Sequence, residues 1–130
     1  MNAFLISVFF AWFLAQVVGK IIAASIVRRK FYLRAALFQA GMPSAHAALV
    51  SAVSVATGFD QGFYSTLFYI SLVFAILIIY DVLFVRAMFI RNSNHTLVDE
   101  MFHIGHRPAE VAVGILIGIL TVILMQPFLT

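Results

Sequence analysis

The stretch FYSTLFYISLVFAILIIY, residues 63–80, contains no charged residue and is long enough to cross most of a bilayer as a helix. Residues 2–19 form a second uncharged run of similar length. Hydrophobic residues make up 64% of the 130 residues and charged residues 10%, whereas a soluble domain is about half apolar and about a quarter charged. The composition therefore excludes an ordinary soluble domain and predicts an integral membrane protein.

Four helices are expected around this stretch, separated by polar segments or by Pro and Gly. Pro43 suits the first turn of a helix and Gly58 a helix end. The polar segment RNSNHTLVDEMFHIGH, residues 91–106, carries enough apolar side chains to form a short interfacial helix. We predict an all-α integral membrane protein, a single domain over residues 1–130, folded as a compact bundle of about four transmembrane helices. The predicted spans are residues 2–27, 43–58, 62–86 and 108–126.

Basic residues are unevenly distributed along these predicted spans. If each helix crosses once, segments 28–42 and 87–107 lie on one side of the membrane and both termini lie on the other. All eight Lys and Arg residues then fall on or toward the first side, which the positive-inside rule assigns to the cytoplasm. The same arginines could instead bind an anion, and their distribution would then say less about orientation.

Small residues recur every four positions in two of the predicted helices. Gly114 and Gly118 have this spacing, and so do Ala48, Ala52 and Ala56. Small side chains at this spacing allow helix backbones to approach closely. The pattern predicts packing within one bundle, and the alternative is the contact surface of a homodimer.

Ionisable residues inside the predicted spans require an explanation, because a charge near the bilayer centre costs roughly 2.5–3.5 kcal/mol on insertion scales. Lys20 could extend toward the basic end of its helix, or it could face the bundle and bind an anion. Asp81 and Arg86, in YDVLFVR (residues 80–86), could form a structural ion pair. Alternatively, Arg86 binds an anion and Asp81 orients it, since the planar guanidinium can bind two phosphate oxygens.

Two further polar residues, Ser44 and His46, follow a Gly-Met-Pro break in GMPSAHAAL, residues 41–49. Ser44 could simply cap the helix, and His46 could be an interfacial residue. A helix amino terminus is also an anion site, because its N–H groups are unpaired and the helix dipole is positive there. A hydroxyl and an imidazole at this end would make a phosphate cradle.

His106 and Glu110 lie four residues apart in GHRPAEVAVG, residues 105–114, and share a helix face if the helix begins by His106. A carboxylate bonded to one imidazole nitrogen fixes the tautomer and makes the other nitrogen a better nucleophile. The alternative is a helix-start carboxylate beside an interfacial His. The His, Lys, Arg and carboxylate groups all fall at one predicted membrane face, and together they suit phosphoryl transfer through a histidine.

The segments GMPSAH, YDVLFVR and GHRPAEVAVG, in this order, resemble the divergent branch of the type 2 phosphatidic acid phosphatase superfamily, which is related to vanadium haloperoxidases. The resemblance implies that Lys20 and Ser44 bind phosphate and that His46 protonates the leaving alcohol. It implies further that His106 is the nucleophile that forms a phosphohistidine, with Glu110 in the place of an Asp. The chemistry of the superfamily needs no metal, and no cofactor is expected.

Some positions differ from the superfamily pattern. Val27 stands where the first motif has an Arg, and Arg28 is the next residue. Glu100 stands where the third motif has an Arg, and Arg86 or Arg91 could supply that cation. The candidate phosphate-binding arginines are therefore Arg28, Arg86 and Arg91.

Three functional hypotheses follow. The leading one is an integral membrane phosphatase that hydrolyses a lipid phosphate or diphosphate through a phosphohistidine. The second is a non-catalytic lipid-phosphate binding or transport protein, which the missing third-motif Arg favours. The third is a metal-dependent membrane hydrolase that uses His103, His106 and Glu110, since zinc takes such ligands, although the cationic surroundings would repel a divalent ion. We expect a membrane lipid with a phosphate headgroup as partner, and no nucleic acid.

Overall fold

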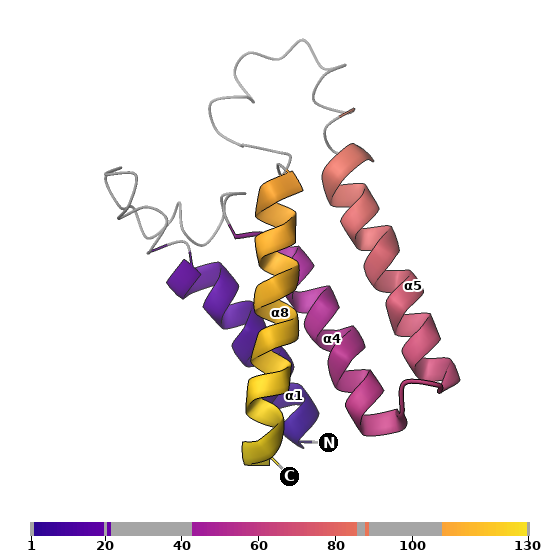
Figure 1. The fold of residues 1–130 in the computed structure, drawn as a ribbon. Helices are drawn as coiled ribbons and strands as arrows, with labels where there is room; N and C mark the ends of the chain where they lie inside the picture. The colour runs from indigo at the N-terminus through magenta and orange to yellow at the C-terminus, as the bar shows by residue number, and fades with distance from the viewer. Residues whose placement is uncertain (1, 20, 22–42, 86–87, 89–107, 130) are drawn as a thin grey trace.

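The computed structural model describes residues 2–19, 21, 43–85, 88 and 108–129, and every regular element within these ranges is helical. Helix α1 (Asn2–Phe13) continues into the π-helical segment η1 (Leu14–Gly19). Helix α5 (Thr66–Tyr80) continues in the same way into η2 (Asp81–Val85). Helices α4 (Ala45–Gln61) and α8 (Pro108–Leu129) complete a bundle (Figure 1). The prediction of an all-α fold is confirmed for this part of the chain.

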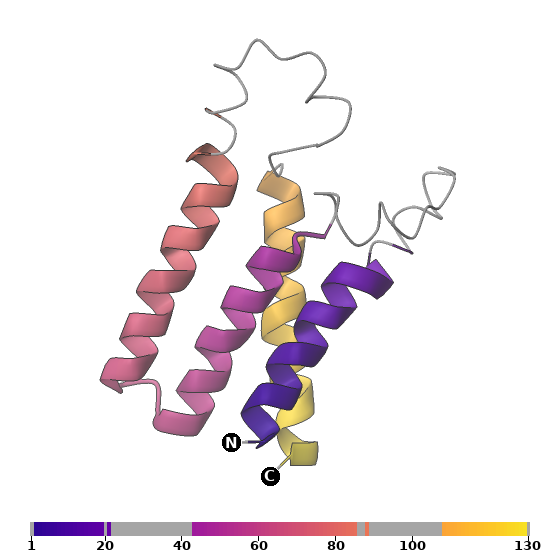
Figure 2. The same ribbon diagram turned by 180° about the vertical axis from the view of Figure 1, so that it is seen from behind.

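Helix α4 lies at the centre of the bundle and contacts α1, α5 and α8. Seen from behind, α4 lies between α1 and α5 (Figure 2). Its buried residues are mostly small: Ala45, Ala47, Ala48, Val50, Ser51, Ala52, Ser54, Ala56 and Gly58. Small side chains let neighbouring backbones approach closely, so this composition allows α4 to be surrounded by three other helices.

The closest approach in the bundle is between α4 and α8. A Cβ atom added to Gly114 would overlap the carbonyl oxygen of Ser44, and one added to Gly118 would overlap the carbonyl oxygen of Ala48 and the Ser51 hydroxyl. A side chain of any size at either position would therefore force the two helices apart. The predicted packing of these glycines within one bundle is confirmed, and a homodimer stays a prediction.

The remaining small residues of the predicted pattern also pack inside the bundle. Ala52 and Ala56 of α4 form a buried cluster with Val8 and Ala11 of α1 and with Val122 of α8. Hydroxyl groups add links between helices. The Ser54 hydroxyl donates to the Ser71 carbonyl oxygen of α5 at 3.1 Å, and the Ser51 hydroxyl lies 3.3 Å from the Ile115 carbonyl oxygen of α8.

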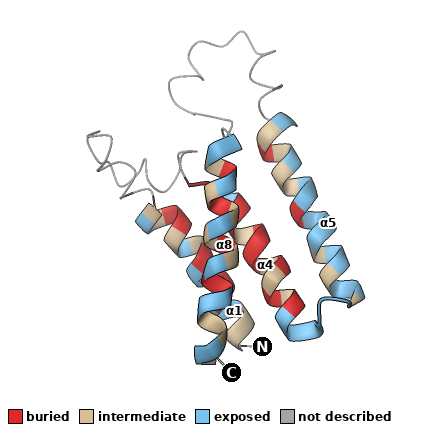
Figure 3. Cartoon of the chain, viewed as in Figure 1, coloured by how far each residue is buried: buried red, intermediate tan, exposed pale blue. Residues whose placement is uncertain are grey.

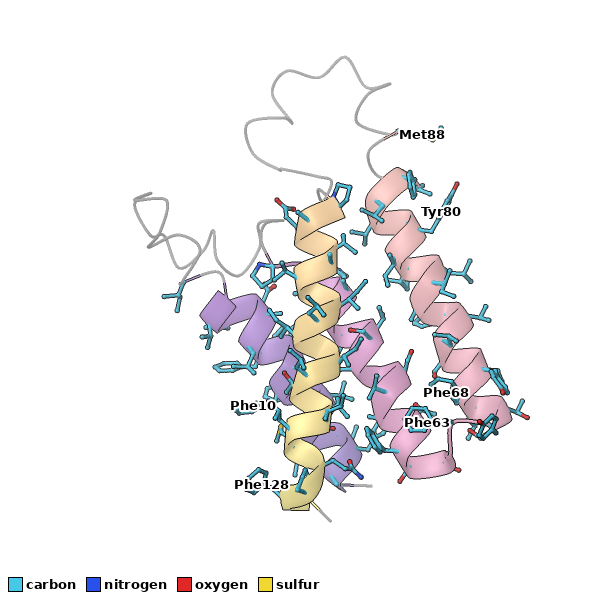
Figure 4. All side chains as sticks on the ribbon, viewed as in Figure 1. Phe10, Phe63, Phe68, Tyr80, Met88 and Phe128 are labelled. Atoms are coloured by element: carbon cyan, nitrogen blue, oxygen red, sulfur yellow. The ribbon has the colours of Figure 1, made fainter. Side chains whose placement is uncertain are left out.

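Helix α5 is the most exposed element. Ala75 is its one buried residue, whereas most of its large apolar side chains are exposed (Figure 3). Figure 4 shows Phe10, Tyr80 and Phe128 at the periphery of the bundle. Apart from the face that packs on α4, helix α5 exposes apolar side chains over most of its surface, which suits a lipid environment rather than water.

Two of the four helical stretches are long and apolar enough to cross a membrane. These are Thr66–Val85 and Pro108–Phe128, while Ala3–Gly19 is a shorter apolar helix. The prediction of an apolar helical bundle is thus confirmed, and the prediction of four membrane crossings is not established by helix length. The predicted interfacial helix at 91–106, and the part of the first span beyond Ile21, lie outside the described residues.

The predicted boundary between the second and third helices is displaced by three to four residues. Helix α4 does not end near Gly58 but continues to Gln61, and Gly62, with a φ of 91°, follows it. Gly62 suits this end because a positive φ strains residues that carry a Cβ. Gly58 instead lies inside the helix, where the absence of a side chain makes room for the Phe63 ring. Helix α5 consequently begins at Thr66 rather than at 62.

Two other boundaries shift by only a few residues. Helix α4 begins at Ala45 after its cap Ser44, two residues beyond the predicted start at Pro43. Helix α8 begins at Pro108 as predicted and continues to Leu129, three residues past 126. The carboxyl ends of the first and third helical stretches and the amino ends of α4 and α8 lie at one end of the bundle, and both termini lie at the other (Figures 1 and 2).

Substitution of Ala48 tests the close packing around α4. Ala48 is fully buried with Ala15 and Ala45, so we expect Ala48→Leu to lower the free energy of unfolding by about 1–3 kcal/mol through overpacking. Ala112 on α8 is exposed, and Ala112→Leu is the matched control, with an expected change within about 0.5 kcal/mol. Unfolding in mixed micelles of increasing SDS content measures both. Equal stability of the two variants would contradict the central position of α4.

Candidate functional site

The Ser44 peptide joins the start of α4 to the start of α8. Its backbone N–H donates to the Glu110 carbonyl oxygen at 3.1 Å. Its carbonyl oxygen lies against Gly114 of α8 and accepts from the Ala48 backbone N–H at 3.1 Å. The segments GMPSAH and GHRPAEVAVG, distant in the chain, are therefore in direct backbone contact.

Ser44 is also the amino-terminal cap of α4. Its hydroxyl oxygen accepts from the Ala47 backbone N–H at 3.3 Å, and the side chain is fully buried. Capping satisfies one of the helix N–H groups that have no partner within the helix. The structural alternative considered for Ser44 from the sequence is thus confirmed. Its predicted role as a phosphate ligand stays a prediction.

A second contact joins the end of the first helical stretch, at Gly19, to Pro43, the residue before Ser44. A Cβ atom on Gly19 would lie 2.6 Å from Cδ and Cγ of the Pro43 ring, so Gly19 is in close contact with the residue before Ser44. Lys20, the next residue, lies outside the described residues. Gln16, in the same π-helical segment, is a buried polar residue within an otherwise apolar stretch.

The remaining motif segment, YDVLFVR, also lies at this end of the bundle, where its residues 81–85 form η2. Val82 of η2 is almost fully buried in a cluster with Ala47 of α4 and Val111 of α8, one residue after Glu110. Asp81, the first residue of η2, is half-buried. In the cluster of Ala47, Val82 and Val111, the residue directly after GMPSAH packs against one residue from each of the other two motif segments. We call this cluster the motif junction.

Two of the proposed chemical groups lie on the first turns of the joined helices. His46 is exposed on the first turn of α4. Glu110 is half-buried in the first turn of α8, where the positive end of the helix dipole favours a carboxylate. His46, Asp81 and Glu110 each interact with another group. An imidazole and a carboxylate are therefore present at the same end of the bundle.

The other predicted site residues lie outside the described part of the chain. They are Lys20, Arg28, Arg86, Arg91, His103 and His106. Within the described ranges, no group of three His, Asp or Glu side chains could hold a metal ion. Because His103 and His106 are not among those residues, the metal hypothesis is not tested by this observation.

Three features of the site were not assigned to it from the sequence. The contact of Gly19 with Pro43, the motif junction, and the position of Gly114 against Ser44 all depend on packing between distant segments. One sequence signal was available for Gly114. It follows Glu110 by four residues in GHRPAEVAVG, so both lie on one face of α8.

These features define a protein whose described residues form an apolar helical bundle, with the described parts of the three motif segments close together at one end. The sequence profile of the Divergent PAP2 family matches residues 1–121, and the chain belongs to this family. The predicted membership in the divergent branch is confirmed.

A similar curated protein is the "Uncharacterized membrane protein YuiD" of Bacillus subtilis (strain 168). The two chains are 28% identical over 141 aligned positions, which cover 88% of this chain and 87% of the relative. No solved structure shows a significant match. The apolar helices and the relative together support a membrane location for this protein.

The two serine caps provide a matched pair of substitutions. Ser65 caps α5 as Ser44 caps α4, and its hydroxyl accepts from the Phe68 backbone N–H at 3.1 Å. We expect Ser44→Ala and Ser65→Ala each to lower the free energy of unfolding by about 1 kcal/mol. Stability can be measured by SDS titration. A loss in Ser65→Ala without a loss in Ser44→Ala would contradict the capping role of Ser44.

Proposed function

We propose that this protein is an integral membrane phosphatase that hydrolyses a lipid phosphate or diphosphate through a phosphohistidine. The observation that carries the proposal is the hydrogen bond between Ser44 and Glu110, which holds two motif segments of the Divergent PAP2 family together. The motif junction adds the third segment. Family membership supports a phosphatase-related activity, and the convergence supports a shared site at the end of the bundle.

In the proposed reaction, neutral His106 attacks phosphorus, and the bond from phosphorus to the leaving oxygen breaks. Protonated His46 gives its proton to that oxygen. A water molecule then attacks phosphorus, the bond between phosphorus and the His106 nitrogen breaks, and phosphate is released. His46 regains a proton from the attacking water, which restores both histidines. Attack by an imidazole and proton transfer by a second one divide a difficult hydrolysis into two easier steps.

Cations and hydrogen-bond donors are required for the charge on the transferring phosphoryl group. We assign this role to Lys20, Ser44 and one of the arginines Arg28, Arg86 and Arg91, with Asp81 orienting a neighbouring cation. Capping uses the Ser44 oxygen as an acceptor, and a hydroxyl also carries one donor hydrogen. Because the Ser44 side chain is fully buried, this role requires the amino end of α4 to be uncovered when the lipid headgroup binds. Glu110 is assigned to hold the tautomer of His106. The phosphate of a membrane lipid lies at the interface, which suits a site at helix ends.

We further propose that all four helical stretches cross the membrane. Helix α4 has 17 residues, or about 26 Å at 1.5 Å per residue, against a hydrocarbon core of about 30 Å. Most of its small residues and two of its serines, Ser51 and Ser54, are buried against other helices, while the exposed polar residues His46, Asp60 and Gln61 lie at its two ends. This distribution supports a central membrane helix. In this arrangement the end that carries the motif segments faces the cytoplasm, and both termini lie on the other side.

One observation favours a non-catalytic lipid-phosphate binding or transport protein instead. Glu100 stands where the superfamily has an Arg, and a carboxylate there would repel phosphate. Such a protein would keep the anion site without turnover.

Phosphate release by the purified protein in detergent separates these functions. With a panel of lipid phosphates and diphosphates and with EDTA present, we expect the wild type to release phosphate. His106→Ala should be inactive, because it lacks the nucleophile. His46→Ala should be about 10²–10⁴-fold slower, because it lacks the general acid. His95→Ala is the control and should retain activity.

Two results would contradict the proposal. Activity that disappears in EDTA and returns with zinc would indicate the metal-dependent hydrolase. Binding of lipid phosphate by well-folded protein, without release across the panel, would indicate a binding or transport protein.

A further inference from the structure

Gly114 is the point at which α8 comes closest to the amino end of α4. A Cβ atom added there would overlap the Ser44 carbonyl oxygen and would lie 3.1 Å from the Ala47 side chain. Gly114 lies within a regular helix, whereas the glycine with a positive φ is Gly62. Gly114 is therefore needed for space rather than for an unusual backbone conformation.

Ser44 is held on both sides of its peptide by residues four apart on α8. Its N–H donates to the Glu110 carbonyl oxygen, and its own carbonyl oxygen lies against Gly114. Residues four apart lie about one helical turn apart on the same face. Because α8 is a continuous helix, the contact at Gly114 sets the distance between the first turn of α8 and Ser44.

We propose that Gly114 is a positioning residue for phosphoryl transfer. It lets α8 approach Ser44 closely enough for the hydrogen bond to Glu110, and so holds the Glu110 turn beside the start of α4. The inference rests on the proposed function for its catalytic consequence. Gly114 does not contact substrate in this account and acts through the position of Glu110 and Ser44.

An added methyl group at position 114 meets a backbone oxygen, which cannot rotate away as the end of a long side chain can. The two helices must therefore separate at this level. A misplacement of about 1 Å can lower a rate about 100-fold. We expect Gly114→Ala to lower kcat about 100-fold while KM changes by less than about threefold, since the headgroup contacts are retained.

Gly118→Ala is the matched control. Gly118 also packs against an α4 backbone carbonyl oxygen, that of Ala48, but it lies one turn, about 5.4 Å, farther from the motif segments. We expect the two variants to be destabilised to a similar extent. A purely structural role of both glycines would lower kcat equally in both, whereas the positioning role lowers it far more in Gly114→Ala.

The test combines kcat and KM for a lipid phosphate in mixed micelles with hydrogen exchange at the Ser44 amide. In the wild type and in Gly118→Ala, the hydrogen bond to Glu110 should protect this amide, and in Gly114→Ala the protection should fall at least tenfold. If Gly114→Ala does not fold, Ala47→Val introduces bulk at the same contact from α4 and should show the same losses.

Unchanged protection of the Ser44 amide in Gly114→Ala, or an equal loss of kcat in the two glycine variants at equal stability, would overturn the inference. These results can be distinguished from failure of the proposed phosphatase function, because in that case the wild type itself would release no phosphate. The exchange measurement would still decide whether Gly114 holds Ser44 against α8.

Discussion

The hydrogen bond from the Ser44 N–H to the Glu110 carbonyl oxygen is the contact on which the proposed site depends. A backbone N–H that is buried in an apolar bundle needs a partner, because leaving it unpaired costs several kcal/mol in a lipid environment. Ser44 precedes α4 and cannot pair its N–H within that helix. Helix α8 supplies the partner, and the need for one ties the two motif segments together.

That hydrogen bond is possible only because both helices carry small residues at the contact. Gly114 leaves room for the Ser44 carbonyl oxygen, and Gly118 repeats the arrangement one turn later. The motif junction of Ala47, Val82 and Val111 then adds the third segment by apolar packing. Close packing of small residues therefore brings polar groups of distant segments to one end of the bundle.

Much of this arrangement could be predicted from the sequence, because it follows from local patterns. The uncharged run at 63–80 predicted an apolar helix, and Pro43-Ser44 predicted the start of α4. The end of α4 was predicted three residues early because Gly58 and Gly62 are both glycines in the same local sequence. The structure distinguishes them, since Gly62 has a positive φ and Gly58 makes room for the Phe63 ring inside the helix. The Ser44–Glu110 bond could not be predicted, because it joins backbone atoms and has no side-chain signature.

The candidate site was likewise predictable in part. The sequence located His46, Asp81 and Glu110 at one end of the helices, and the structure places them there. The π-helical geometry of the segments before Lys20 and from Asp81 onward was not predicted, because apolar side chains of this kind suit α and π turns alike. π-Helical turns are frequent at functional sites, and both of these lie at the end where the motif segments converge.

If His106 carries the phosphoryl group during turnover, as proposed, the phosphohistidine can be trapped. The protein would be mixed with a lipid phosphate labelled with ³²P, quenched in base within milliseconds, and digested. We expect a base-stable, acid-labile label on the peptide that contains His106, and no label on that peptide in His106→Ala. Phosphate release with no label on any histidine peptide, at times when turnover is under way, would contradict the proposed phosphohistidine.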